Sequence, residues 1–166
     1  MAVIGIDPGT AITGYGVVEE GPAGNLHAVT YGILETQAGI EPSLRLLSLS
    51  KQLSRILKTF TPESGAVEML FFQRNVKTAI SVGQARGIIL LSLAERDIPV
   101  FEYNPMDVKQ SVTGYGKADK AQIQQMVKTL LHLEDIPKPD DAADALAVAI
   151  CHLHNNRFNK LKKRYV

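Results

Sequence analysis

Short apolar runs dominate the first part of the chain. Residues 2–6 form such a run, which ends at the turn-forming Asp7-Pro8-Gly9, and residues 13–20 and 26–36 also have the composition of strands. The turn-rich segment 21–25 separates the second run from the third. Because these links are short, the pattern predicts three antiparallel strands that follow one another as a meander.

Helical spacing first appears after Pro42. Apolar residues then recur every three or four positions up to Phe60, which predicts an amphipathic helix that ends before Pro62. The same reasoning predicts further strands at 65–70 and 98–103, and further helices at 76–96, 105–112, 119–131 and 140–155. Three leading strands followed by alternating elements predict an α/β domain that has a mixed five-stranded sheet with helices on both faces.

Length and composition limit the class of protein. The 166 residues suffice for a single domain, and a hydrophobic content of 45% is too high for a disordered chain. The longest apolar run, at 87–94, is far shorter than the ~20 residues that cross a bilayer. A single cysteine, Cys151, excludes an internal disulfide, and Asp7 comes too early for a signal peptide. We therefore expect a soluble, cytoplasmic protein.

Charge is unevenly distributed along the chain. Residues 157–166 hold five basic residues and no acid, so 13 of the 18 basic residues remain in the body of the chain, against 17 acidic ones. We expect a folded domain over 1–156 and a flexible basic tail over 157–166. Such a tail either contacts a polyanion or is a solvated end of the chain.

Two acids lie in or directly after apolar strands. Asp7 is at the carboxyl end of the first strand, an edge at which open α/β sheets bind ligands, although an ordinary Asp-Pro-Gly turn would also explain it. Glu68 lies inside the apolar segment 65–70, where an unpaired carboxylate is costly to bury. An edge strand or a salt bridge is the structural alternative, but no basic residue follows before Arg74. A functional role is therefore favoured for Glu68.

Asp141 and Asp144 share one face at the start of the last predicted helix, because they are three residues apart. Acids in a first turn also suit the helix dipole, an explanation that covers Asp140 better than Asp144. With Asp7 and Glu68 they supply four carboxylates, which would repel one another unless cations were bound. Oxygen ligands without His or Cys favour two Mg²⁺ or Mn²⁺ ions ~4 Å apart, an arrangement suited to phosphoryl displacement.

Several segments, taken in order, resemble one protein family. They are Gly5-Ile6-Asp7-Pro8-Gly9-Thr10, Thr13-Gly14-Tyr15-Gly16, Val67-Glu68 with the Phe that follows, Gly83-Gln84-Ala85-Arg86-Gly87, Pro99-Val100-Phe101-Glu102-Tyr103, Val108-Lys109-Gln110 and Asp141-Ala142-Ala143-Asp144-Ala145-Leu146-Ala147. Along nearly its whole length the chain thus resembles the RuvC-type Holliday-junction resolvases, which have a ribonuclease H-like fold. The resemblance implies a Mg²⁺-dependent endodeoxyribonuclease of DNA recombination and repair. It would bind four-way junction DNA as a homodimer and nick two opposite strands.

The functional residues of that family can be carried over to the matching positions. The catalytic, metal-binding acids fall on Asp7, Glu68, Asp141 and Asp144, although some relatives have His in place of Asp141. The aromatic residue that works at the junction falls on Phe71, and Phe72 beside it is expected to be a core residue. The DNA contacts fall on Lys109 and Lys120, and further on Arg74, Lys77, Arg86 and Lys117. The resemblance also implies the RuvA-RuvB branch-migration complex as a partner.

Two other classes of function are open. Residues 6–10 also resemble the first phosphate loop of the actin and sugar-kinase ATPases, but those proteins need a second domain and a second phosphate loop. A non-catalytic junction-binding module would tolerate neutral residues at the acidic positions, and it leaves Glu68 unexplained. Cys151, His152 and His154 lie close together without a Cys-x-x-Cys partner, so we expect helix residues there and no zinc site.

Overall fold

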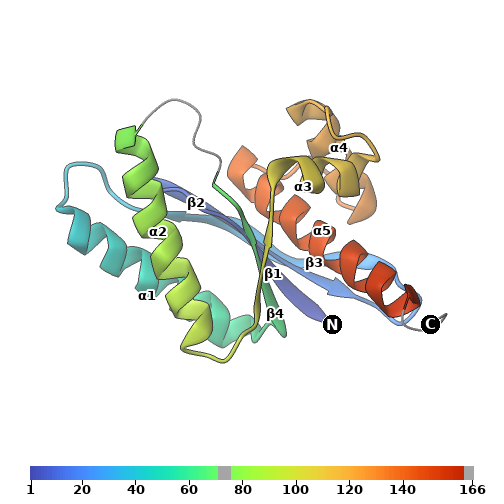
Figure 1. The fold of residues 1–166 in the computed structure, drawn as a ribbon, viewed down its shortest axis with the longest axis horizontal. Helices are drawn as coiled ribbons and strands as arrows, with labels where there is room; N and C mark the ends of the chain where they lie inside the picture. Colours follow the sequence, from blue (N-terminus) through green and yellow to red (C-terminus); the bar gives the residue numbers. More distant parts are fainter. Residues whose placement is uncertain (71–75, 163–166) are drawn as a thin grey trace.

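The computed structural model of the protein describes the backbone of residues 1–70 and 76–162 and the side chains of residues 1–70 and 79–156. One five-stranded sheet runs through the molecule in the order β3-β2-β1-β4-β5 (Figure 1). Its strands are β1 (Ala2–Asp7), β2 (Ile12–Glu20), β3 (Leu26–Glu35), β4 (Ser64–Glu68) and β5 (Val100–Tyr103). The first three pair antiparallel and the last two extend the sheet in parallel, which confirms the predicted meander and the mixed sheet.

Helices cover both faces of this sheet, as predicted. Helices α1 (Pro42–Phe60) and α2 (Val76–Ala94) lie on one face, and α3 (Pro105–Thr113), α4 (Lys120–Leu130) and α5 (Asp140–Lys162) lie on the other (Figure 1). Each face has its own buried cluster. The α1–α2 side includes Ile4, Ile6, Leu53 and Leu93, and the α5 side includes Val3, Val18, Leu146 and Ile150.

Alternation along the central strands decides which side chains face α5. On β1, Ile4 and Ile6 join the α1–α2 cluster, whereas Val3 joins the α5 cluster. Asp7 has the same parity as Val3, so it points to the α5 side. On β4 the parity is set by Ala66 in the α5 cluster, and Glu68 therefore points the same way. The pleat of two buried strands thus directs two acids toward one helix.

Glycines allow α5 to approach the sheet very closely. A Cβ added at Gly5 would lie 2.1 Å from the carbonyl oxygen of Ala145, and one added at Gly14 would lie 1.9 Å from that of Asp141. On β2, a Cβ at Gly16 would lie 2.6 Å from the side chain of Leu146. Since real Cβ atoms cannot occupy these positions, the backbone of α5 lies where only glycine fits beneath it.

A buried histidine fastens the β4–β5 side of the sheet to α5. His152 lies 3.1 Å from the Ser64 hydroxyl, 2.8 Å from the Tyr103 hydroxyl and 2.8 Å from the Asn156 amide, and its ring packs on Phe101. Burial lowers the pKa of His152 to about 4, so the ring is neutral at pH 7. The residue is a structural one, as expected for this part of the helix.

Several element boundaries differ from the predicted ones by one or two residues, and the ends of β4 and α5 matter most for the site and the tail. Strand β4 ends at Glu68, whereas the sequence predicted a strand up to residue 70. Helix α5 continues to Lys162, seven residues beyond the predicted end, so it includes residues 157–162 of the segment expected to be a tail. Nothing in the sequence of that segment breaks a helix. Among the described residues, no helix combines the length and the apolar character needed to cross a membrane.

Replacing Gly5 with alanine should destabilise the fold, because the sheet and α5 would have to separate. We expect the free energy of unfolding, measured in urea, to fall by about 3 kcal/mol. Gly116→Ala is the matched control, since its Cβ would first meet the flexible Met106 side chain, at 3.2 Å. If Gly5→Ala and Gly116→Ala lower the free energy of unfolding by the same amount, the close approach of α5 to the sheet is not important for stability.

Candidate active site

Asp7 and Glu68 lie side by side at the carboxyl edge of the sheet. Strands β1 and β4 are parallel neighbours in which Ile6 pairs with Val67, so the next residues along each strand are these two acids. A hydrogen bond joins their side chains, and both residues are half-buried. Such a bond requires a proton shared between two carboxyl groups, because two carboxylates would only accept. The sequence placed Asp7 at this edge and Glu68 inside a strand over 65–70, and the structure brings the two into contact at the same edge.

Asp141 and Asp144 reach the same edge from the first turns of α5. The main chain of Asp141 lies directly over Gly14, the residue that pairs with Asp7 in the sheet. Asp144 follows one turn later and is close enough to raise the pKa of both Asp7 and Glu68. The four acids that the sequence singled out therefore come together at one place in the fold.

Negative charge accumulates at this place. Burial raises the pKa of Asp7 to about 8, and the neighbouring carboxylates, Glu68 first among them, add to the rise. Burial likewise raises the pKa of Glu68, with Asp144 adding to it. The pKa of Asp144 is also raised by burial, although Lys120 opposes the shift. The site is thus short of positive charge, which is the condition under which a bound cation stabilises carboxylates.

Two lysines lie beside the acids in a cleft that is also lined by Pro105, Val108, Ile123 and Ala147. Lys120 forms ion pairs with Asp144 at 3.3 Å and with Asp140 at 3.2 Å. Partial burial lowers the pKa of Lys120, but these carboxylates outweigh that effect, and the net shift is upward. Lys109 acts on Glu68 from the other side and lowers its pKa. The two family-derived lysines therefore share one cleft with Glu68 and Asp144.

The donor set suits a divalent ion, but the side chains do not already surround one. All four acids offer oxygen ligands, which Mg²⁺ and Mn²⁺ prefer. Within the described part of the chain, however, no three His, Cys, Asp or Glu side chains form a group that could hold a metal ion. Asp7 and Glu68 bind each other, and Asp144 binds Lys120. Holding an ion between the acids requires these contacts to be exchanged for metal ligands.

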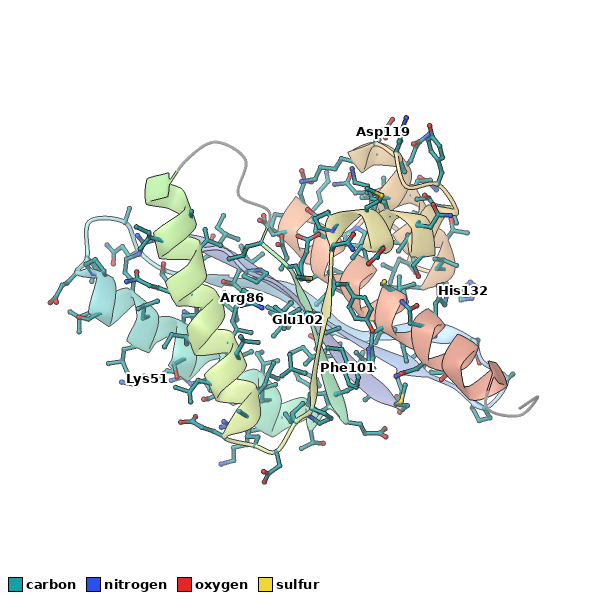
Figure 2. The ribbon with its side chains drawn as sticks, in the orientation of Figure 1. Lys51, Arg86, Phe101, Glu102, Asp119 and His132 are labelled. Carbon is teal, nitrogen blue, oxygen red and sulfur yellow. The ribbon has the colours of Figure 1, made fainter. Side chains whose placement is uncertain are left out.

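The other expected DNA contacts are less well placed. Arg86 of α2 forms an ion pair with Glu102 of β5, on the face of the sheet opposite to the acids (Figure 2). Its Nε is buried and has no hydrogen-bond partner among the described residues. Lys117 is exposed in the loop before α4. The side chain of Lys77, together with Phe71, Phe72 and Arg74, lies outside the described residues.

Sequence reasoning missed the part that Asp140 plays. It was interpreted as an acid that suits the helix dipole, whereas the structure shows it bound to Lys120 and also to the Gln124 amide at 2.9 Å. One available signal was the position of Lys120 directly after the capping residue Asp119, because a cation in a first helical turn opposes the dipole. Such an unfavourable placement indicates a partner outside the helix.

Neutralising Asp7 should stabilise the protein in a buffer with chelator. Between pH 3.8 and about 8, the folded protein keeps on Asp7 a proton that the unfolded chain has lost, so this carboxyl destabilises the fold increasingly as the pH rises. We expect Asp7→Asn to gain on the order of 2 kcal/mol in urea unfolding at pH 8, and less toward pH 4. Asp140→Asn is the control, because Lys120 and Gln124 lower the pKa of that exposed acid. If Asp7→Asn is no more stable than this control, the repulsion among the acids is overstated.

Comparison with known proteins agrees with this geometry. The sequence matches the family model described as "Crossover junction endodeoxyribonuclease RuvC" over residues 3–152. A protein of that name from Desulforamulus reducens is 59% identical over 153 residues, which cover 92% of this chain and 93% of the relative. One from Caldicellulosiruptor saccharolyticus is 52% identical over 153 residues, with 92% of each chain covered.

Solved structures agree with the fold. A Thermus thermophilus RuvC structure has a TM-score of 0.88 at 36% identity, covering 96% of this chain and 97% of that one. A second T. thermophilus RuvC structure, in complex with Holliday junction substrate, has a TM-score of 0.87 at 34% identity, covering 95% and 96%. The yeast mitochondrial resolvase Ydc2 shares the fold at 18% identity, with a TM-score of 0.68. The match covers 99% of this chain and 84% of Ydc2. These matches confirm the expected ribonuclease H-like fold, and the chain belongs to the RuvC family of crossover junction endodeoxyribonucleases.

Proposed function

We propose that the protein resolves four-way Holliday junctions by hydrolysing a phosphodiester bond in each of two opposite strands. Family membership supports this activity, and a relative from T. thermophilus has been seen with junction substrate. One observation in this chain carries the proposal. Two half-buried carboxyl groups, Asp7 and Glu68, are in contact with each other, and the first turns of α5 bring two more to the same edge. Such a concentration of acid has no structural benefit, and it suits a cation-dependent reaction.

In the proposed chemistry, Asp7, Glu68, Asp141 and Asp144 hold two Mg²⁺ ions, which Mn²⁺ can replace. When bound, the ions would activate a water for attack on phosphorus and stabilise the leaving 3′ oxygen, so no protein nucleophile is required. The four acids fix the positions of these charges because they lie on rigid, buried elements. The raised pKa values of Asp7, Glu68 and Asp144 are the mark of this role, since a divalent cation would lower them again.

We propose that the lysines of the cleft bind the phosphates of the DNA backbone. Lys109 and Lys120 lie on α3 and α4 at the entrance to the acids, where a phosphate drawn to the metal ions would meet them. Lys117, exposed before α4, extends this basic side. We leave Arg86 out of the proposed contacts, because its guanidinium is engaged with Glu102 on the other face of the sheet. Each neutralised phosphate should add to the salt dependence of binding.

A homodimer is the proposed assembly, and α2 offers the surface for it. Ile80 and Leu91 are exposed on the side of α2 turned away from the core, with Gly83 and Gly87 between them in the same stripe. Added Cβ atoms at the two glycines would meet nothing within 4 Å. An apolar stripe with small residues at its centre suits close packing against a second copy of the same helix. A two-fold dimer would match a two-fold junction and account for paired nicks.

The remaining partner is proposed from the family alone. A RuvA-RuvB branch-migration complex would deliver junctions to this enzyme, and failure of the two to associate on junction DNA would remove it from the proposal. We propose a cytoplasmic location as well, because the substrate would be the junction DNA of the cell. The ATPase and non-catalytic alternatives gain no support from the family match.

Asp7→Asn should bind a synthetic four-way junction as the wild type does and lose nicking altogether, because this charge serves the metal and not the DNA. Gel-shift and nicking assays measure the two properties separately. Chelation with EDTA should stop nicking by the wild type, Mg²⁺ should restore it, and Ca²⁺ should support binding only. Retained nicking by Asp7→Asn, or nicking in EDTA, would refute the proposed chemistry.

Leu91→Glu should convert the protein to a monomer, because a charge would be buried within the proposed contact. Analytical ultracentrifugation measures the mass. Leu44→Glu is the matched control, since Leu44 is 53% exposed on α1 and Leu91 is 54% exposed on α2. A Leu91→Glu variant that sediments as a dimer would exclude α2 as the interface.

A further inference from the structure

Lys120 occupies an unusual place, between the acids of the site and the end of another helix. Its ammonium group lies 3.3 Å from Asp144 Oδ2 and 3.2 Å from Asp140 Oδ2, so one cation is shared by two carboxylates of α5. The Gln124 amide donates to the other oxygen of Asp140 at 2.9 Å. The start of α4 is thereby tied to the start of α5.

Local helix energetics do not explain a lysine at this position. Asp119 caps α4 in a capping box with Gln122, which makes Lys120 the first residue of the helix, where the positive end of the dipole repels a cation. About half of the Lys120 side chain is exposed, at 54%, so it does not contribute to the core. The carboxylates of Asp140 and Asp144 on α5 stabilise the ammonium group in this position. The interactions of Lys120 are therefore with the acid site and not with its own helix.

Asp144 has two competing sets of neighbours. On one side are Asp7 and Glu68, whose pKa values it raises through their shared negative charge. On the other side is Lys120, which forms an ion pair with Asp144. Among the described residues, no other ion pair involves any of the four acids of the site. While Asp144 is bound to Lys120, the acids do not form a group that could hold a metal ion, in the part of the chain described.

We propose that Lys120 is a resident counter-ion that holds Asp144 in the metal-free protein and competes with the divalent ion for that carboxylate. The inference rests on the proposed function, since it takes Asp144 to be a metal ligand. Once Asp144 turns to the ion, Lys120 keeps only the exposed Asp140 as a partner and faces the cleft that it shares with Lys109. The same positive charge then becomes available to a DNA phosphate, so metal binding prepares the cleft for substrate.

Binding of Mn²⁺ to the full-length, DNA-free protein tests the competition without any measurement of activity. Free Mn²⁺ is followed by electron paramagnetic resonance in wild type, Lys120→Met and Lys120→Arg at one ionic strength. We expect Lys120→Met to bind Mn²⁺ on the order of 10-fold more tightly, because a competing charge is removed from the ligand. Lys120→Arg keeps the charge and should remain close to wild type. Junction nicking by Lys120→Met should fall at the same time, an opposite change that a purely structural lysine would not produce.

Lys109→Met separates competition from a general effect of charge. It removes an equal charge from the same cleft, but among the described residues Lys109 forms no ion pair within 4 Å. We expect its gain in Mn²⁺ affinity to be clearly smaller, about two- to threefold. Equal gains in the two variants, or unchanged or weaker Mn²⁺ binding by Lys120→Met, would overturn the counter-ion role and leave the metal site intact. If neither wild type nor any lysine variant binds Mn²⁺, or if Asp7→Asn binds it as wild type does, the proposed metal site itself fails.

Discussion

The arrangement depends on how closely α5 lies on the sheet. Gly5, Gly14 and Gly16 leave no room for any side chain beneath the helix, and the facing residues of α5 include small, fully buried alanines such as Ala145 and Ala149. Contact at this range fixes the helix in position and in rotation, because a shift by one residue would drive side chains into backbone. The first turns of α5 therefore have one location, over the ends of β1 and β4.

Because α5 lies there, four acidic side chains come close to one another at the edge of a stable sheet, and their mutual repulsion is unfavourable. Asp7 and Glu68 reach the edge of the sheet after strands that are buried on both faces, and α5 adds Asp141 and Asp144 from above. Mutual repulsion and burial favour unfolding at neutral pH, as the raised pKa of Asp7 shows. The apolar clusters on the two faces of the sheet outweigh this cost. A cluster of acids that lowers stability in this way fits a functional site.

Much of this was predictable from the pattern of residues, for a physical reason. Strand pleat and parallel pairing are local rules, so an acid that follows an apolar run, such as Asp7, can be placed at a sheet edge, and two acids three apart can be placed on one helix face. Pairings between long side chains of distant elements are not encoded in spacing. Lys120 with Asp140, and Arg86 with Glu102, emerged only from the structure, as did the length of α5, whose end carries no stop signal.

The two kinds of charge at the site are held very differently. The acids stand on the central strands and on a helix packed against them, and Tyr103, the partner of Glu68 in the sheet, is itself anchored by the buried His152. The lysines stand on α3 and α4, and the Lys120 side chain is more exposed than that of its partner Asp144. An exposed, flexible ammonium can exchange partners at little cost, whereas the half-buried acids have short side chains whose backbone is held in the sheet and in α5, so they can change partners only locally. This division suits the proposed reaction on DNA, in which the acids would already lie together and the contacts to the backbone would form as the substrate arrives.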